Sequence, residues 1–168
     1  MRLVECVVET EDVDALVAAL DAVGDRHGVT VQAFDARYVA DRAHLERAVE
    51  LADRERGRGE AIARDRGVEI LLYAAGRRQI DRALEMGVAA GRTPVVVLVD
   101  AGPSETDGEA AAAAAVRDLD AGEPGPVETG DPERLQAFFD VGDAELAAAD
   151  GDLAALVRER VALLVVER

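Results

Sequence analysis

Short apolar runs alternate with stretches of helical periodicity along the chain. Three runs rich in valine, at residues 3–8, 29–34 and 94–99, predict β-strands. A fourth run, residues 68–73 (Val-Glu-Ile-Leu-Leu-Tyr), is interpreted in the same way, because consecutive large apolar residues are typical of a strand buried on both faces. Residues 35–40 are expected to form an extended connection after the second run.

Helices are predicted where apolar residues recur at i, i+3, i+4 and i+7 after a residue that can cap a helix. Thr10 is expected to open the first helix, and Asp41, Asp131, Asp143 and Asp152 are expected to open later ones. The predicted helices cover residues 11–23, 41–56, 77–86, 109–119, 132–139, a short segment from 143, and 153–164. In the helix over 77–86, Ile80, Ala83 and Leu84 are expected to face inward, and Gly87 to end the helix in a left-handed conformation.

The order β-α-β-α-β-α-β followed by helices predicts the α/β (α+β) class. We expect one domain over residues 1–168, a sandwich of a mixed four- to five-stranded sheet and flanking helices. The length of 168 residues suits one domain with a core of its own. Stretches rich in Gly, Pro and acidic residues predict a flexible acidic loop around residues 101–130.

Charge is distributed unevenly. The chain has 35 acidic residues and 19 basic ones, all arginine, for a net charge of −16. Residues 54–99 nevertheless carry nine Arg against six acidic residues, whereas residues 100–153 carry two Arg against 15. The acidic excess is interpreted as adaptation to a salt-filled cytoplasm, and an ordinary acidic bacterial protein remains the alternative.

The basic segment suggests one candidate site. If residues 68–73 form a strand, Gly76-Arg77-Arg78 lies at the start of the next helix, where free N–H groups and guanidinium groups favour an anion. Arg58, Arg64 and Arg66 reach the same end only if their loop folds back. A solvated charged face is the competing interpretation. The turn lacks the glycine spacing of a phosphate-binding loop, so no nucleotide cofactor is expected.

Other chemistry has less support. Cys6 is the only cysteine, which excludes an internal disulfide and fits a reducing cytoplasm. Cys6, His27 and His44 lack metal-ligand spacing, so neither a metal nor another cofactor is expected. His44 is interpreted as a buried structural residue rather than a general base. No apolar stretch is long enough to span a membrane, and Glu5 and Glu9 interrupt the N-terminal apolar run, so no signal peptide is expected.

Several short motifs, in their order and spacing, resemble a known family. They are Ala33-Phe-Asp-Ala36, His44-Leu45 followed by Ala48, the loop from Arg58 to Arg64, Glu69-Ile-Leu-Leu-Tyr73, Arg78-Gln-Ile80, Ala83-Leu84 and Gly87-Val88. More loosely, Phe138, Glu145-Leu146 and Arg160-Val-Ala-Leu-Leu164 extend the similarity toward the C-terminus. Together they resemble the small regulatory subunit of the KEOPS complex, the family of the p53-related protein kinase-binding protein (TPRKB), here from a halophilic archaeon. Residues 105–130 match no motif of that family.

The resemblance implies a non-catalytic cytoplasmic subunit of the complex that makes threonylcarbamoyladenosine in tRNA. Such a subunit binds the kinase-like subunit and the 3′ CCA end of tRNA, and it supports threonylcarbamoyl transfer to an adenosine next to the anticodon. By motif position, RNA contact is carried over to Arg58, Arg64, Arg78 and Gln79, with Arg77 beside them. Kinase contact is carried over to the last predicted helix, at Leu153, Leu156 and Val157.

Two other functions remain open on the residues alone. One is a small α/β enzyme or binding protein for a phosphorylated small molecule at the Gly76-Arg77-Arg78 helix start. The other is a protein-interaction module that has kept its kinase partner and lost RNA binding. Loss of binding when the CCA end is trimmed from tRNA would separate the KEOPS subunit from this second alternative.

Overall fold

A computed structural model of the chain describes residues 1–103, 107–119 and 122–166. By its contacts the chain divides into two compact units. The first unit comprises Met1–Ala36 and Gly87–Val127, and the second comprises Arg37–Met86 and Glu128–Arg168. Helices and a four-stranded sheet confirm the predicted α+β class. One domain over residues 1–168 remains a prediction.

The first unit contains an antiparallel sheet in the order β2-β3-β1-β4. Its strands are β1 (Arg2–Thr10), β2 (Thr30–Asp35), β3 (Gly91–Asp100) and β4 (Gly122–Pro124). β1 and β3 pair along their whole length, from Arg2 opposite Val99 to Thr10 opposite Gly91. Every pairing among the described strands is antiparallel, so the prediction of a mixed sheet is wrong. The short edge strand β4, which ends in proline, supplies the fourth strand.

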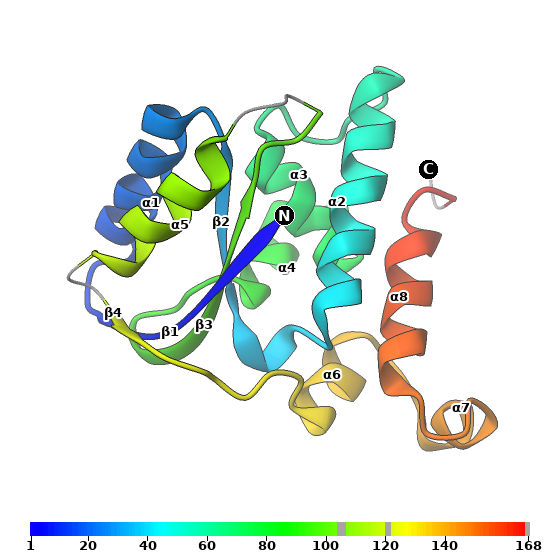
Figure 1. Cartoon of the computed structure of the whole chain (residues 1–168). Coiled ribbons are helices and arrows are strands. Elements are labelled where there is room, and N and C mark those ends of the chain that lie inside the picture. The colour runs from blue at the N-terminus through cyan, green and yellow to red at the C-terminus, as the bar shows by residue number, and fades with distance from the viewer. Residues whose placement is uncertain (104–106, 120–121, 167–168) are drawn as a thin grey trace. The chain divides into compact units, whose positions relative to one another are not determined.

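Two helices cover one face of this sheet, α1 (Val13–His27) and α5 (Gly108–Arg117) (Figure 1). Alternate strand residues point to them because side chains in a strand alternate between the two faces. The resulting core joins the sheet residues Val4, Cys6, Val8, Val31, Ala33, Val95, Val97 and Val99 to the helix residues Leu16, Leu20, Val23, Ala112, Ala113 and Val116. Small side chains on α5 let its backbone approach the sheet, so a chain with few aromatic residues still closes this core.

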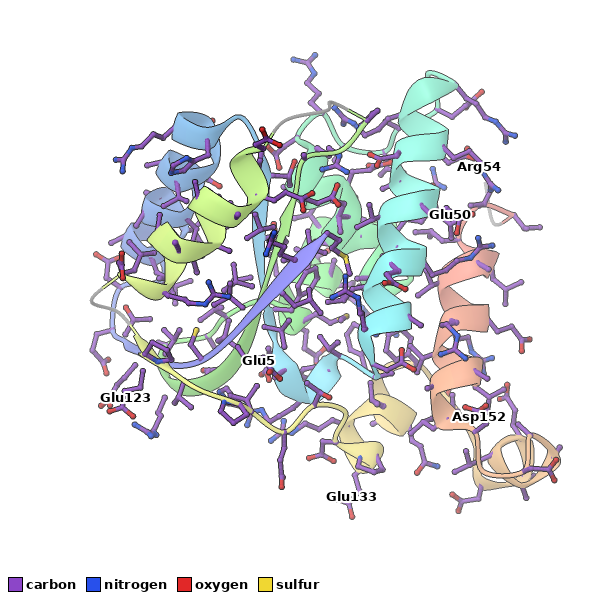
Figure 2. The ribbon with its side chains drawn as sticks, in the orientation of Figure 1. Glu5, Glu50, Arg54, Glu123, Glu133 and Asp152 are labelled. Atoms are coloured by element: carbon purple, nitrogen blue, oxygen red, sulfur yellow. The ribbon has the colours of Figure 1, made fainter. Side chains whose placement is uncertain are left out.

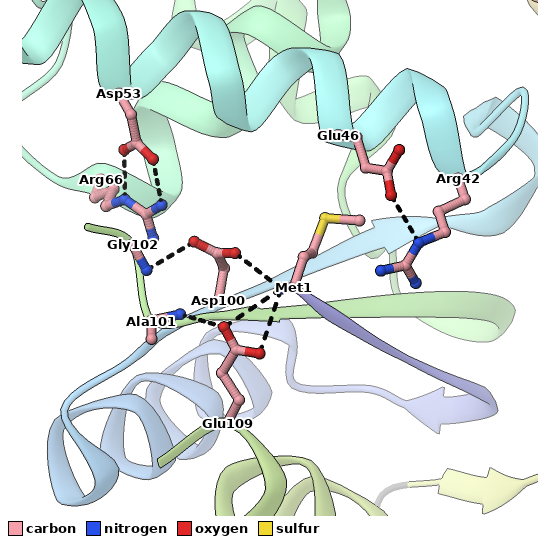
Figure 3. Close-up of polar contacts among 9 residues, drawn as sticks. All are labelled: Met1, Arg42, Glu46, Asp53, Arg66, Asp100, Ala101, Gly102 and Glu109. Carbon is pink, nitrogen blue, oxygen red and sulfur yellow. Dashed lines mark hydrogen bonds and ion pairs between the residues drawn. The ribbon is translucent and has the colours of Figure 1, made fainter. Parts of the chain in front are cut away.

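The segment expected to be a flexible acidic loop, around residues 101–130, contains α5 and β4. Residues 104–106 and 120–121 of that prediction lie outside the described residues. The Asp100 and Glu109 carboxylates each lie 3.3 Å from the Met1 amino group (Figure 3). Glu109 also accepts the Ala101 N–H at 2.8 Å, so Asp100 and Glu109 hold the end of β3 to the start of α5.

At Gly108 the start of α5 lies close against the end of α1. A Cβ atom placed there would lie 2.2 Å from the His27 carbonyl oxygen and 3.1 Å from Val29 Cγ1. We therefore expect Gly108→Ala to lower the free energy of unfolding by about 1–3 kcal/mol, because backbone must move to relieve the overlap. Urea unfolding measures this. Gly57→Ala is the matched control, since a Cβ atom there meets nothing within 4 Å. Equal stability of the two variants would contradict the prediction.

The second unit is helical in its described residues. After the turn η1 (Ala36–Tyr38), it contains α2 (Arg42–Gly57), α3 (Arg66–Ala75), α4 (Ile80–Ala83), η2 (Leu84–Met86), α6 (Pro132–Phe138), α7 (Asp143–Ala148) and α8 (Leu153–Leu163). α2, α3 and α8 pack on one another, with α8 beside α2 in Figure 1. The turn η1 replaces the extended connection that was expected over residues 35–40.

Most predicted caps are confirmed. Side chains of Asp41, Asp131 and Asp152 accept backbone N–H groups at the starts of α2, α6 and α8, at 2.8, 3.0 and 3.0 Å. Two predictions are wrong. Asp12 caps α1 in place of Thr10, by accepting the Ala15 N–H at 3.0 Å. Gly142 precedes α7 in place of Asp143, which lies in the first turn.

The largest correction concerns residues 68–73, which form the centre of helix α3 and not a strand. Asp65 caps the helix by accepting the Val68 N–H at 2.9 Å, and Gly76 ends it in a left-handed conformation with φ of 61°. Eight of its ten residues are buried. A helix buried all round carries consecutive apolar residues, as a buried strand does, and the run alone cannot separate the two.

The helix predicted over residues 77–86 is also shorter than expected. Only α4 and the 3₁₀ turn η2 form there. Ala83 is buried as predicted, but Ile80 and Leu84 are 50% and 57% exposed, so the prediction that they face inward is wrong. Gly87 does not adopt the left-handed conformation that was expected of it.

Candidate nucleic-acid interface

The arginines of the basic segment lie toward the two ends of α3. Arg58 and Arg64 precede the helix, and Arg77 and Arg78 follow it. The ten residues of α3 rise by about 15 Å, so the two groups are separated by roughly that length along the axis. They do not gather at one helix start. The predicted strand before Gly76 is a helix, and Gly76 ends it. Arg77 and Arg78 lie between this helix and the four-residue α4.

Two buried interactions fix the loop that carries Arg58 and Arg64. Glu69 is fully buried in α3, and its carboxylate accepts the N–H groups of Ile62 and Ala63 at 3.1 and 2.7 Å. Arg56 Nη1 donates to the carbonyl oxygens of Ala63 and Arg64 at 3.3 and 2.9 Å. The loop backbone is thus held from both sides, and the position of Arg64 is set by side chains in α2 and α3.

Glu69 has a structural role in this loop that residue types alone did not identify. We expect Glu69→Gln to lower the free energy of unfolding by about 1–3 kcal/mol, because an amide NH₂ would face one of the two backbone N–H donors. Urea unfolding measures the loss. Glu46→Gln is the control, since Glu46 is exposed and pairs with Arg42 at 2.8 Å, a surface ion pair that contributes little stability. A loss at Glu69 no larger than that at Glu46 would refute the prediction.

Some of the arginines are engaged in ion pairs within the second unit. Arg66 holds Asp53 with two bonds of 2.8 Å from Nε and Nη2, drawn in Figure 3. Arg54 and Arg58 lie 3.2 and 3.3 Å from the same oxygen, Oε1 of the fully buried Glu55. Arg66 is therefore structural. The Arg58 side chain is 60% exposed and can still turn part of its guanidinium to a ligand.

Three predicted RNA-contact residues present uncommitted side chains. Arg64, Arg78 and Gln79 are exposed, and within the described ranges none of their side chains makes a hydrogen bond or ion pair. Gln79 precedes α4 as its N-cap residue without a side-chain capping bond. These are the donors that an added ligand can engage without breaking a bond of the fold.

Arg77 differs from its neighbour. Its guanidinium donates from Nη2 to the carbonyl oxygen of Phe138 and lies 5.1 Å from the centre of the Phe138 ring. It is only half-buried, so its outer N–H groups remain available, but their direction is fixed by the aromatic ring and the carbonyl. Arg77 thus forms a wall of a cleft in the second unit.

His44 is a buried structural residue, as its position suggested. Its Nδ1 accepts the Ala40 N–H at 3.1 Å, so the proton is assigned to Nε2, which donates to the Ala74 carbonyl at 2.8 Å. Burial lowers the pKa of His44 to about 4, and the bond to Ala74 offsets this only in part. A histidine with both nitrogens engaged is not available as a general base.

The three predicted partner contacts differ in accessibility. Val157 is fully buried in α8 and Leu156 is 7% exposed, whereas Leu153 is half-buried at the first turn. In this conformation Leu153 is the member of the set that a partner can reach. Leu163, at the other end of the same helix, is 38% exposed.

Among the residues that the structure describes, no group of three or more His, Cys, Asp and Glu side chains is placed to hold a metal ion. The lone thiol, Cys6, is buried, and burial raises its pKa. No helix in the described ranges combines the length and the apolar character needed to cross a bilayer.

Arg64, Arg78 and Gln79 are thus exposed polar side chains on the helical second unit. Comparison with known families identifies the class of protein. The family described as kinase binding protein CGI-121 matches residues 10–164, nearly the whole chain. The chain belongs to this family of kinase-binding proteins. A search of curated proteins finds no match.

Proposed function

We propose that this chain is a non-catalytic regulatory subunit of a KEOPS-type tRNA modification complex. In this role it binds the kinase-like subunit and the 3′ CCA end of tRNA, and so supports threonylcarbamoyl transfer to an adenosine next to the anticodon. Membership of a kinase-binding family supports the first partner. The observation that carries the second is the exposure of Arg64, Arg78 and Gln79 without partners among the described residues, in a chain with nearly twice as many acids as bases.

Electrostatics restricts how such an RNA contact works. A net charge of −16 repels a polyanion at long range, but at roughly 1 M salt the Debye length is about 3 Å and distant acids hardly act. The same screening weakens the counterion release that usually drives nucleic-acid binding. Affinity then comes from short-range contacts, arginine stacked on bases and bidentate bonds to phosphate, and we expect it to fall only modestly with salt. We therefore propose that the protein works in a salt-rich cytoplasm.

The ends of α3 bear on the form of RNA involved. The backbones at Arg64 and Arg78 lie beyond opposite ends of this helix, which is about 15 Å long. Both side chains are exposed, so an extended single strand can contact the two residues in succession. This supports a single-stranded segment such as a CCA end.

Kinase contact is assigned to the accessible side of α8. Leu153 supplies an apolar side chain there, while Leu156 and Val157 support the helix from its buried side. Apolar side chains that remain partly exposed on a surface helix are a common anchor for a partner. The two functions therefore use different parts of the second unit, α8 for the kinase and the ends of α3 for RNA.

Separation of the two activities tests the proposal. The purified chain is titrated with the kinase-like protein of the same organism and, separately, with tRNA. Leu153→Glu should weaken the kinase complex by about tenfold or more and leave tRNA affinity unchanged, since a buried charge at an interface is costly. Arg78→Glu should do the reverse. Failure of the chain to bind the kinase-like protein, or loss of both activities in a folded single variant, would refute the assignment.

A further inference from the structure

A cleft of about 430 Å³ lies within the second unit, in the size range of small-ligand sites. We call it the α6 cleft, because half of its lining residues come from that helix. Its walls are formed by Tyr38, Arg77, Arg82, Glu85, Glu133, Arg134, Ala137 and Phe138. Arg77 connects it to the predicted RNA contacts, because its sequence neighbours Arg78 and Gln79 are the exposed donors described above.

Most polar groups of the α6 cleft are held in place. Tyr38 and Phe138 contact each other edge to face, with ring centres 5.4 Å apart. Arg77 lies over the Phe138 ring, and Arg134 lies 6.0 Å from the centre of the Tyr38 ring. The Tyr38 hydroxyl donates to Glu85 Oε1 at 3.3 Å. Two guanidinium planes and one carboxylate are thus oriented before any ligand arrives, which lowers the entropic cost of binding.

Two charged groups of the α6 cleft remain uncommitted. The side chains of Arg82 and Glu133 are exposed and make no hydrogen bond or ion pair with another residue in the described ranges, and Glu133 extends away from the α6 ribbon in Figure 2. Glu85 already accepts the tyrosine hydroxyl. The cleft therefore offers a free guanidinium for an anionic group and a free carboxylate for a group that donates hydrogen bonds.

The free Glu133 carboxylate in a cleft lined by arginines restricts which part of a nucleic-acid strand can bind there. An internal nucleotide has a phosphate on both sides of its ribose, and a phosphate brought against Glu133 would be repelled. The last nucleotide of an RNA has a 2′,3′-diol in place of the second phosphate, and hydroxyl groups donate to carboxylates. A carboxylate that accepts ribose hydroxyls is a known element of nucleotide recognition.

We propose that the α6 cleft holds the 3′-terminal nucleotide of a single-stranded RNA and that Glu133 recognises its free 2′,3′-diol. Arg82, with the oriented Arg77, binds the phosphate that precedes this nucleotide, and the Arg134 guanidinium plane stacks on the base. Glu133 repels the phosphate of internal segments and of 3′-phosphorylated ends, so the protein selects strands that end in a free 2′,3′-diol. This inference rests on the proposed function and adds the group that selects the end.

The test compares ends that differ only at the terminal ribose. The affinity of the full chain is measured for one tRNA carrying either a 2′,3′-diol or a 3′-phosphate. Wild-type protein should bind the diol end about tenfold or more tightly, and Glu133→Gln should bring the two affinities within about threefold, because it removes the repulsion and weakens the acceptor. Glu123→Gln, in the first unit and also exposed to solvent, is the control and should keep the wild-type preference. Equal binding of both ends by wild-type protein, or an unchanged preference in Glu133→Gln, overturns the inference while the proposed tRNA binding stands.

A second pair of probes keeps the inference testable if tRNA is not bound. Adenosine 5′-monophosphate is compared with adenosine 3′,5′-bisphosphate by perturbation of NMR signals. Tighter binding of the monophosphate, lost in Glu133→Gln, supports the cleft even though the proposed function has failed. Absence of binding by both compounds, or tighter binding of the bisphosphate, overturns it.

Discussion

Replacing Arg78 by glutamate is expected to abolish crosslinking of the protein to the 3′ end of tRNA. Arg78 is exposed and lies two residues after Gly76, the left-handed residue that ends α3. Its side chain makes no hydrogen bond to another described residue. The loss of a charge-assisted bond and its replacement by a repulsion at contact distance should weaken binding by about 100-fold. Because the contact is short-range, the loss should persist in high salt.

The control for this prediction must reverse one charge elsewhere. Arg92→Glu changes the net charge by the same amount at a position whose side chain is 60% exposed, in β3 of the first unit. It should leave crosslinking near the wild-type level, because Arg92 is not among the residues assigned to RNA contact. If Arg92→Glu and Arg78→Glu lose binding to the same degree, general electrostatics explains the interaction and Arg78 is not a contact.

Lowering the pH from 7 toward 4 is expected to destabilise the protein through His44. Its pKa of about 4 in the folded state lies below the ordinary value of 6.5, so the unfolded chain binds a proton more readily over this interval. Stability from this group is complete above pH 6.5 and is lost as the pH falls toward 4. The expected loss in the free energy of unfolding is on the order of 3 kcal/mol.

Comparison of variants isolates this contribution from the many carboxylates that also titrate. Urea unfolding between pH 7.5 and about 4.5 should show a gap between wild type and His44→Gln that narrows as the pH falls, since only wild type has this imidazole to protonate. His27→Gln removes the other histidine, which is half-buried at the end of α1, and should keep the wild-type pH dependence. A constant gap between wild type and His44→Gln would show that the burial of His44 does not control its protonation.

The sequence allowed the elements with local signals to be predicted. Asp41, Asp131 and Asp152 mark the starts of their helices because a cap joins residues that are only two or three positions apart. The Val-rich strands β1 and β3 were predictable because every second side chain of each strand is buried in the core of the first unit. Residues 68–73 were misassigned because burial on all sides removes the periodicity. Asp65 and Gly76, which bracket α3, carried the missing signal, a cap at one end and a left-handed glycine at the other.

The site was predictable in part. The sequence shows where arginines cluster, but it does not show which of their guanidinium groups form hydrogen bonds or ion pairs within the folded protein. Arg66 binds Asp53, 13 residues earlier, and Arg77 binds Phe138, 61 residues later. Glu69 belonged to the motif that carried the family resemblance, yet its role in holding the loop at Ile62 and Ala63 required coordinates. The α6 cleft joins residues from 38 to 138, a separation that no local pattern reveals.

The central claim is that this kinase-binding protein also holds the single-stranded 3′ end of tRNA. The most direct measurement is the affinity of the purified chain for one tRNA with its CCA end intact and with that end removed enzymatically, at the salt concentration of the native cytoplasm. The account predicts measurable binding of the intact tRNA and none of the trimmed one. Equal affinity for both, or no binding of either, would contradict it.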